Sequence, residues 1–238
     1  MTTGESGAAP GTVRNDKRTI FGWAMYDWAN SAYITIFGAV IGAFFTGTIM
    51  QGDTYWGLSG EALFSILIGI GSIVLMLSMP VLGAMADYAD SKRRSLRNFA
   101  FLGAIFVLIT PFVPDGQVPL FLLVVVVSQF GFVAANVFYD GFLPEIASDD
   151  TIDRVSSKGF ALGYLGGGLY LLFALVLIFF SSDEPGAALS EALAARIAIF
   201  GSGVWWIAFA LFSLARLPAD PARAATRSLG EYASIGFD

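Results

Sequence analysis

Six long apolar segments follow one another along the chain, and they limit the folds that this sequence can adopt. The segments cover residues 20–50, 61–86, 96–113, 117–139, 159–181 and 192–215. An α-helix needs about 20 apolar residues to cross a hydrocarbon core of about 30 Å, and each segment supplies close to that length. The sequence therefore predicts an all-α membrane protein built as a bundle of six transmembrane helices.

The basic residues alternate with these segments, and the alternation predicts an orientation. Of the 13 Lys and Arg residues, 12 lie in or next to the N-terminal arm, the second link, the fourth link and the tail. Only Arg196, near the start of the sixth segment, breaks the pattern. Basic residues that flank transmembrane helices stay on the cytoplasmic side. Both termini are therefore expected to be cytoplasmic.

Composition supports a membrane protein and excludes several kinds of chemistry. Hydrophobic residues make up 56% of the chain and charged residues 13%, whereas soluble domains are about 25% charged. The chain has no Cys and no His, which excludes disulfides, thiolate chemistry and imidazole metal sites. We expect no cofactor and no metal. The net charge of −6 argues against nucleic acid as a partner.

Three regions follow from these patterns. Residues 1–19 are polar and predict a disordered cytoplasmic arm. Residues 20–216 form the predicted six-helix transmembrane domain. Residues 217–238 contain two prolines and scattered Arg, which is typical of a polar cytoplasmic tail or the start of a linker between two halves.

Polar residues within the first segment need an explanation, because a charge at membrane depth costs at least a few kcal/mol, about 3 on insertion scales. Asp27, Asn30 and Ser31 lie at three- and four-residue steps, and Thr35, Gly38, Gly42 and Thr46 continue the same stripe. We interpret the stripe as the lining of a substrate or proton pathway, or of a gate. The alternative is an Asp that pairs helices or reaches the cytoplasmic interface.

The fourth segment carries a second polar face. Gln129, Asn136 and Asp140 are spaced seven and four residues apart, and Tyr139 lies beside them. The same pathway or gate is the functional interpretation. The alternative is that Asn136 only hydrogen-bonds a neighbouring helix and that Asp140 lies at the interface.

Two further motifs stand out. Gly159, Gly163 and Gly167 recur every four residues, which favours close helix packing. Gly83 and Asp87 end the second apolar segment, and Lys92, Arg93 and Arg94 follow. The basic cluster is in part a topology signal. An Asp at a helix C-terminus opposes the helix dipole, however, and this predicts a specific partner for Asp87.

At these residues the chain resembles the major facilitator superfamily. The run from Gly83 through Asp87 to Arg94 is similar to the loop between the second and third helices of that superfamily, with Tyr88 and Asp90 as departures. Three further segments point to one branch of this superfamily: 26–33 (YDWANSAY), 138–147 (FYDGFLPEIA) and 154–168 (RVSSKGFALGYLGGG). Together they resemble the autophagy-related vacuolar effluxers and their prokaryotic relatives, over nearly all of residues 20–216.

The resemblance implies a secondary transporter with twelve helices in two halves, of which this chain supplies the N-terminal one. It implies alternating access, a small-molecule substrate (amino acids in the eukaryotic members) and a latch role for Asp87 in a cytoplasmic gating loop. The expected location is the plasma membrane of a prokaryote, as a multi-pass protein in contact with membrane lipid. The expected partner is a second six-helix half, either a separate chain, a missing C-terminal half or a second copy.

Other functions remain open from sequence alone. Asp87 and Asp90 resemble part of the metal-binding motif of six-span lipid-headgroup transferases, but the second pair of aspartates is absent. Asp27 and Asp140 each follow a Tyr, as in aspartyl intramembrane proteases, but the Gly-x-Gly-Asp signature is absent. A third alternative is a fragment that transports nothing. A transporter rather than an enzyme is the expected function.

Overall fold

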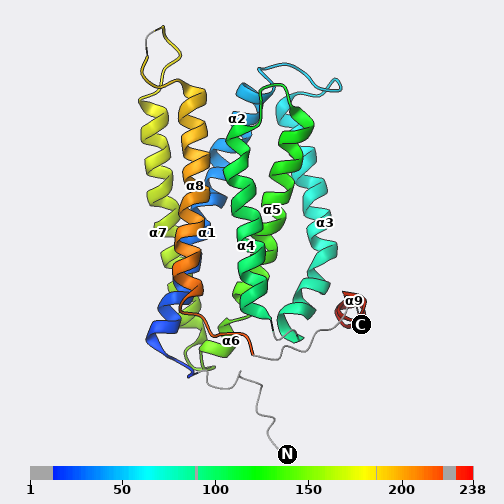
Figure 1. Cartoon of the computed structure of the whole chain (residues 1–238), viewed down its shortest axis with the longest axis vertical. Helices are drawn as coiled ribbons and strands as arrows, with labels where there is room; N and C mark the ends of the chain where they lie inside the picture. The colour runs from blue at the N-terminus through cyan, green and yellow to red at the C-terminus, as the bar shows by residue number, and fades with distance from the viewer. Residues whose placement is uncertain (1–12, 89–90, 186, 222–228, 238) are drawn as a thin grey trace, which may run out of the picture.

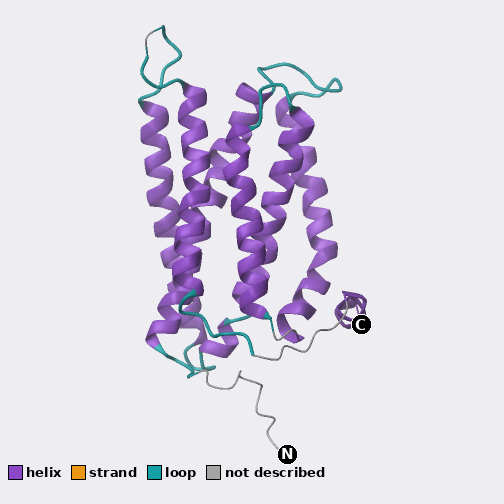
Figure 2. Ribbon diagram, viewed as in Figure 1, coloured by secondary structure: helices purple, strands orange, loops and turns teal. Residues whose placement is uncertain are grey.

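The computed structural model describes residues 13–88, 91–185, 187–221 and 229–237. Within these residues the chain is helical, and six helical spans are long and apolar enough to cross a membrane (Figures 1 and 2). The spans are Lys17–Ile49, Gly60–Tyr88, Lys92–Phe112, Val118–Ile146, Ile152–Phe179 and Glu191–Leu214. The predicted all-α, six-span architecture is confirmed.

The first span is continuous but irregular. Helix α1 (Lys17–Ile36) passes through a π-helical turn (Phe37–Ile41) into the short α2 (Gly42–Phe44) and a second π turn (Phe45–Ile49). Asp16 caps α1, because its carboxylate accepts a 2.8 Å hydrogen bond from the backbone N–H of Thr19.

The other spans are regular helices joined by short links. They are α3 (Gly60–Tyr88), α4 (Lys92–Ile109) with a 3₁₀ turn (Thr110–Phe112), α5 (Val118–Asp140), α7 (Ile152–Phe179) and α8 (Glu191–Leu214). The four-residue helix α6 (Leu143–Ile146) follows α5 after a two-residue turn, and α9 (Leu229–Phe237) lies beside α3.

Two groups of three helices make up the bundle. Helix α1 packs mainly on α7 and α8, and α5 packs on α4 and α3. Figure 1 shows the first group on the left and the second on the right, and α4 and α8 join the groups. The two groups correspond to each other when the first, second and third spans are matched to the fourth, fifth and sixth. The contacts of α1 with α7 and α8 then correspond to the contacts of α5 with α3 and α4. This is the arrangement expected of a repeat of three helices within one half of a transporter.

Several boundaries differ from the sequence prediction. The third span begins at Lys92 rather than at residue 96, and the fifth begins at Ile152 rather than at residue 159. The first turns of both helices carry charged residues. A search for apolar residues leaves these turns out, although they are helical. Helix α1 includes Lys17–Thr19 from the predicted arm, whereas residues 1–12 lie outside the described residues. The predicted tail contains α9, with residues 222–228 and 238 outside the described residues.

The basic residue that breaks the charge alternation has local partners. Arg196 forms a 2.6 Å ion pair with Asp115 and also donates to the backbone carbonyl of Pro111. Its guanidinium lies 5.1 Å from the centre of the Phe44 ring. These contacts hold the start of α8 against the link between α4 and α5. The other described basic residues lie at the opposite end of the bundle, where α1, α4 and α7 begin.

Candidate functional site

A cleft of about 330 Å³ lies between α1, α5 and α7. Six residues predicted to form a pathway or gate line it: Asp27, Asn30, Ser31, Asn136, Tyr139 and Asp140. The remaining lining residues are Trp23, Ile34, Phe132, Leu143, Ser156 and Phe160. Polar groups from two helices that are more than 100 residues apart in sequence therefore meet in one place.

Helix α1 presents one face to the cleft. Trp23, Asp27, Asn30 and Ile34 are spaced by three or four residues, so their side chains lie above one another on that face. Gly163 on α7 lies directly opposite: a Cβ atom placed there would be 2.9 Å from Oδ2 of Asp27 and 3.0 Å from Oγ of Ser31. The absence of a side chain at Gly163 therefore leaves room for the carboxylate.

Hydrogen bonds hold the α5 side of the cleft against α1. Asn30 Nδ2 donates to Oδ1 of Asn136 over 2.7 Å. Trp23 Nε1 donates to the backbone carbonyl of Tyr139 over 2.9 Å, and the two rings stack with centroids 4.4 Å apart. These contacts fix the side chains of Trp23, Asn30 and Asn136 in place.

Three polar groups in the cleft have unused hydrogen-bonding or charge capacity. The Tyr139 hydroxyl is buried and has no hydrogen-bond partner among the described residues. The carboxylates of Asp27 and Asp140 form no ion pair with the part of the chain that the structure describes. An unsatisfied buried polar group costs about 1–3 kcal/mol, and a charge in the membrane costs more. These groups are suited to bind a solute, a cation or water.

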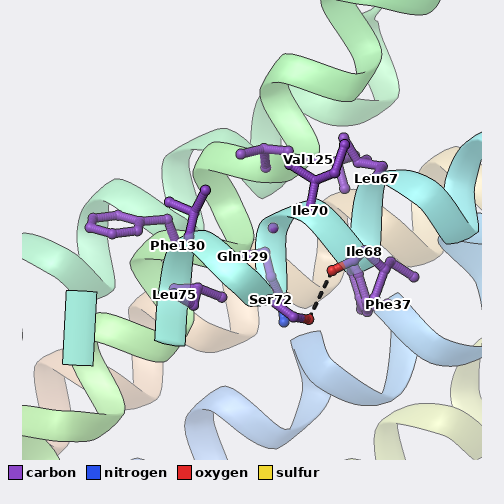
Figure 3. A pocket seen from close by; sticks show the side chains of 12 residues that line it. Phe37, Leu67, Ile68, Ile70, Ser72, Leu75, Val125, Gln129 and Phe130 are labelled. Carbon is purple, nitrogen blue, oxygen red and sulfur yellow. Dashed lines mark hydrogen bonds between the residues drawn. The ribbon is translucent and has the colours of Figure 1, made fainter. Parts of the chain in front are cut away.

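Gln129 lies away from the cleft. It borders a mostly apolar groove of about 160 Å³ between α3 and α5, shown in Figure 3 with Leu67, Ile70 and Val125. Its Oε1 accepts a 3.1 Å hydrogen bond from the hydroxyl of Tyr33, which also bonds with Ser128 over 2.9 Å. Gln129 thus contributes to the contact between α1 and α5 and does not line the cleft.

The residues of the predicted gating loop also lie outside the cleft. Gly83 has open space around its Cα, and Asp87 is exposed near the end of α3. Lys92 forms a 2.6 Å ion pair with Glu145 and donates to the carbonyl of Gly141 over 2.7 Å. Lys92 therefore joins the start of α4 to the turn after α5.

The backbone of the gating loop has a partner from the far end of the chain. The backbone N–H groups of Arg93 and Arg94 donate to the two carboxylate oxygens of Asp220, over 2.8 and 2.9 Å. Ser91, at the N-cap position, makes no side-chain capping bond. Asp220, which follows α8, therefore caps the start of α4.

The three predicted packing glycines lie where α7 crosses α1. A Cβ atom at Gly159 would be 2.8 Å from the Trp23 ring, and one at Gly167 would be 2.7 Å from Oγ1 of Thr35. Gly166, which the four-residue repeat did not include, contacts the backbone of Trp28 in the same way. The two helices therefore approach more closely than residues with side chains would permit.

Sequence reasoning missed several functional neighbours. Trp23 lies on the cleft face, as its spacing of four residues from Asp27 could have indicated. Ser156 and Phe160 on α7 also line the cleft and lie one turn apart. Among the residues of this helix, sequence patterns had singled out only the glycines. Glu145 and Asp220 have no local signal, because their partners are 53 and 127 residues away.

Comparisons with known proteins agree with this arrangement. The family described as "Vacuole effluxer Atg22 like" matches residues 15–153 and 149–238. The chain belongs to the Atg22-like vacuole effluxer family. An "Uncharacterized MFS-type transporter" of Bacillus subtilis (strain 168) is 32% identical over 190 residues, which cover 79% of this chain and 44% of the relative. No solved structure matches.

The matched family is described as effluxers, and the Bacillus subtilis relative is described as a transporter. The chain spans less than half the length of the curated relative that it matches. Among the described residues, no group of three Asp or Glu is placed to hold a metal ion. The family match and the six apolar spans indicate an integral, multi-pass membrane protein.

Proposed function

We propose that the chain is the N-terminal half of a secondary transporter that moves small solutes by alternating access. The cleft between α1, α5 and α7 carries this proposal, because six polar residues from two helices converge there within an otherwise apolar bundle. Polar and ionisable residues at membrane depth are retained where they line a substrate or ion path. In this proposal Asp27, Asn30, Ser31, Asn136, Tyr139 and Asp140 contact the solute or the coupling ion.

A second six-helix half completes the pathway. The proposal is supported by α3, which leaves most of its apolar side chains exposed along its length, including Ile70, Ile73, Met76 and Leu77. The relative's greater length provides for additional helices. Both termini are proposed to be cytoplasmic, in the plasma membrane of a prokaryote, so that a linker after α8 reaches the second half.

The proposed substrate class is amino acids. Asp27 and Asp140 offer two carboxylates to an ammonium group, and the side chains of Asn30 and Asn136 offer amide donors and acceptors. The family description as an effluxer supports export as the direction.

The cytoplasmic gate is proposed to include Asp87 and the loop that follows it. Exposure of Asp87 leaves its carboxylate available to the second half. Lys92, Arg93 and Arg94 hold this loop to α5 and to the segment after α8, so a movement of either is transmitted to the gate.

Transport by the complete protein tests the proposal. Sequencing the coding DNA beyond codon 238 identifies the second half, and the joined protein is reconstituted in liposomes loaded with a panel of radiolabelled amino acids. Asp27→Asn is expected to reduce flux at least about tenfold, because loss of a charge-assisted contact costs about 1.5–3 kcal/mol. The matched control is Asp53→Asn in the exposed outer link, which is expected to leave flux unchanged. Normal flux in Asp27→Asn, with the variant correctly inserted, would contradict the role of the cleft.

A further inference from the structure

A second cavity, of about 730 Å³, lies where α1 and α7 begin. Its lining contains three cations, Lys17, Arg154 and Lys158, together with polar and apolar side chains from Asn15, Ile20, Thr151, Val155 and Ser157. The lining contains no carboxylate. This is unusual in a chain with a net charge of −6. The cleft described above contains two carboxylates, and a cleft at the other end of the bundle contains three, from Asp115, Asp183 and Glu191.

The three cations are not neutralised by the described protein. Lys17, Arg154 and Lys158 are exposed, and none of them forms an ion pair within the described residues. Lys158 Nζ lies over the Phe21 ring, 5.9 Å from its centre, while the Lys158 side chain remains exposed. The pocket therefore offers uncompensated positive charge next to apolar side chains.

A rigid polar connection sets the shape of this pocket. The backbone N–H of Asn15 donates to the carbonyl of Ile146 over 2.7 Å. The Asn15 side chain bonds with Ser148 over 2.6 Å and with the hydroxyl of Thr151 over 2.7 Å. Asn15 adopts a φ of 64°, a left-handed conformation that Asn tolerates better than most residues. The starts of α1 and α7 are thus held at a fixed separation.

The face of α7 that carries the cations continues into the membrane as an apolar stripe. At about 100° per residue, Leu165 and Leu169 lie within about 20° of Lys158 on the helix, whereas Phe160, which lines the solute cleft, lies about 160° away. Leu165 and Leu169 are both exposed. Lys158 to Leu169 spans about 16 Å along the axis, close to the depth of one leaflet of a 30 Å core.

We propose that this pocket binds an anionic phospholipid, with the headgroup phosphate between Lys17, Arg154 and Lys158 and an acyl chain along Leu165 and Leu169. Basic pockets between transmembrane helices at the membrane surface are suited to anionic headgroups. The pocket is separate from the solute cleft, on the opposite face of α7. A bound lipid would join the starts of α1 and α7 at the membrane surface.

Lipid selectivity of the 238-residue chain tests the proposal. The chain is reconstituted in phosphatidylcholine nanodiscs that contain trace spin-labelled phosphatidylglycerol or phosphatidylcholine, and electron paramagnetic resonance gives the relative affinity of the motionally restricted lipid. Arg154→Gln with Lys158→Gln is expected to lower the selectivity for phosphatidylglycerol by about 30-fold, at about fivefold per cation. Lys17→Gln alone, on the other helix, is expected to lower it by about fivefold.

The matched control is Arg94→Gln with Arg97→Gln, which removes two exposed cations from the same end of the bundle but not from the pocket. This control is expected to retain the selectivity of the unmodified chain. An equal loss in the control would show diffuse surface attraction and overturn the proposal, as would equal affinity of the unmodified chain for both lipids. Loss of selectivity in 10 mM inorganic phosphate would assign the pocket to a free anion instead of a lipid.

Discussion

Replacing Gly166 by Ala tests the close contact between α1 and α7. A Cβ atom at Gly166 would be 2.7 Å from the backbone oxygen and 3.1 Å from the Cα of Trp28. Carbon atoms pack best at about 3.5–4.0 Å, so one helix must move by about 0.5–1 Å. A backbone cannot rotate away as a flexible side chain can, and the cost of such overpacking is about 1–3 kcal/mol.

Two further effects modify this cost. The Trp28 carbonyl also accepts a 3.2 Å hydrogen bond from Nε1 of Trp205, and its displacement weakens a bond worth about 1 kcal/mol. Ala stabilises a helix interior by about 0.5–1 kcal/mol relative to Gly. We therefore expect Gly166→Ala to lower the free energy of unfolding by about 1–3 kcal/mol.

Gly168 provides the control, because a Cβ atom there meets nothing within 4 Å. Gly168→Ala lies in the same helix and gains the same helix propensity without the clash, so it is expected to stabilise the chain by about 0.5–1 kcal/mol. The assay is reversible unfolding in mixed detergent micelles, followed by circular dichroism. Equal stability of the two variants would refute the packing argument.

Three other changes have defined outcomes. Lys92→Met leaves Glu145 unpaired and is expected to cost about 2 kcal/mol in micelle unfolding, whereas adding Glu145→Met should recover most of it in a double-mutant cycle. Asp220→Ala removes the cap of α4 and is expected to speed amide exchange at Arg93 about fivefold, with unchanged exchange contradicting the cap. The backbone N–H of Thr19 lowers the pKa of Asp16 below 3.8, so the cap of α1 should persist at that pH and be lost only as pH falls further. The chemical shift of the Thr19 amide reports that titration, and a midpoint above 3.8 would contradict it.

Sequence patterns predicted the six spans and six of the residues that line the cleft. Both predictions depend on the contrast between polar and apolar residues in a membrane. Lipid removes the usual driving force for burying apolar residues, so a polar residue such as Asp27 or Asn136 in an apolar segment is informative by itself. Two partners were not predictable: Glu145, which pairs with Lys92, and Asp220, which caps the start of α4. Both lie in links whose path is set by the packed helices. Gln129 shares a helical face with Asn136 by spacing, yet it accepts a hydrogen bond from Tyr33 and borders the groove between α3 and α5 instead of the cleft.

The position of Asp27 opposite Gly163 links helix packing to the proposed function. Helices α1 and α7 must approach closely to exclude lipid from the interface, and an aspartate would normally hold them apart. The missing side chain at Gly163 removes this conflict, because the space that a Cβ would occupy is taken by the carboxylate of Asp27 and the hydroxyl of Ser31. The same contact thus seals the α1–α7 interface and holds a charged group at the edge of the cleft. Gly159 and Gly167 lie one turn to either side of Gly163 and also face α1, so the close contact continues above and below the level of the carboxylate.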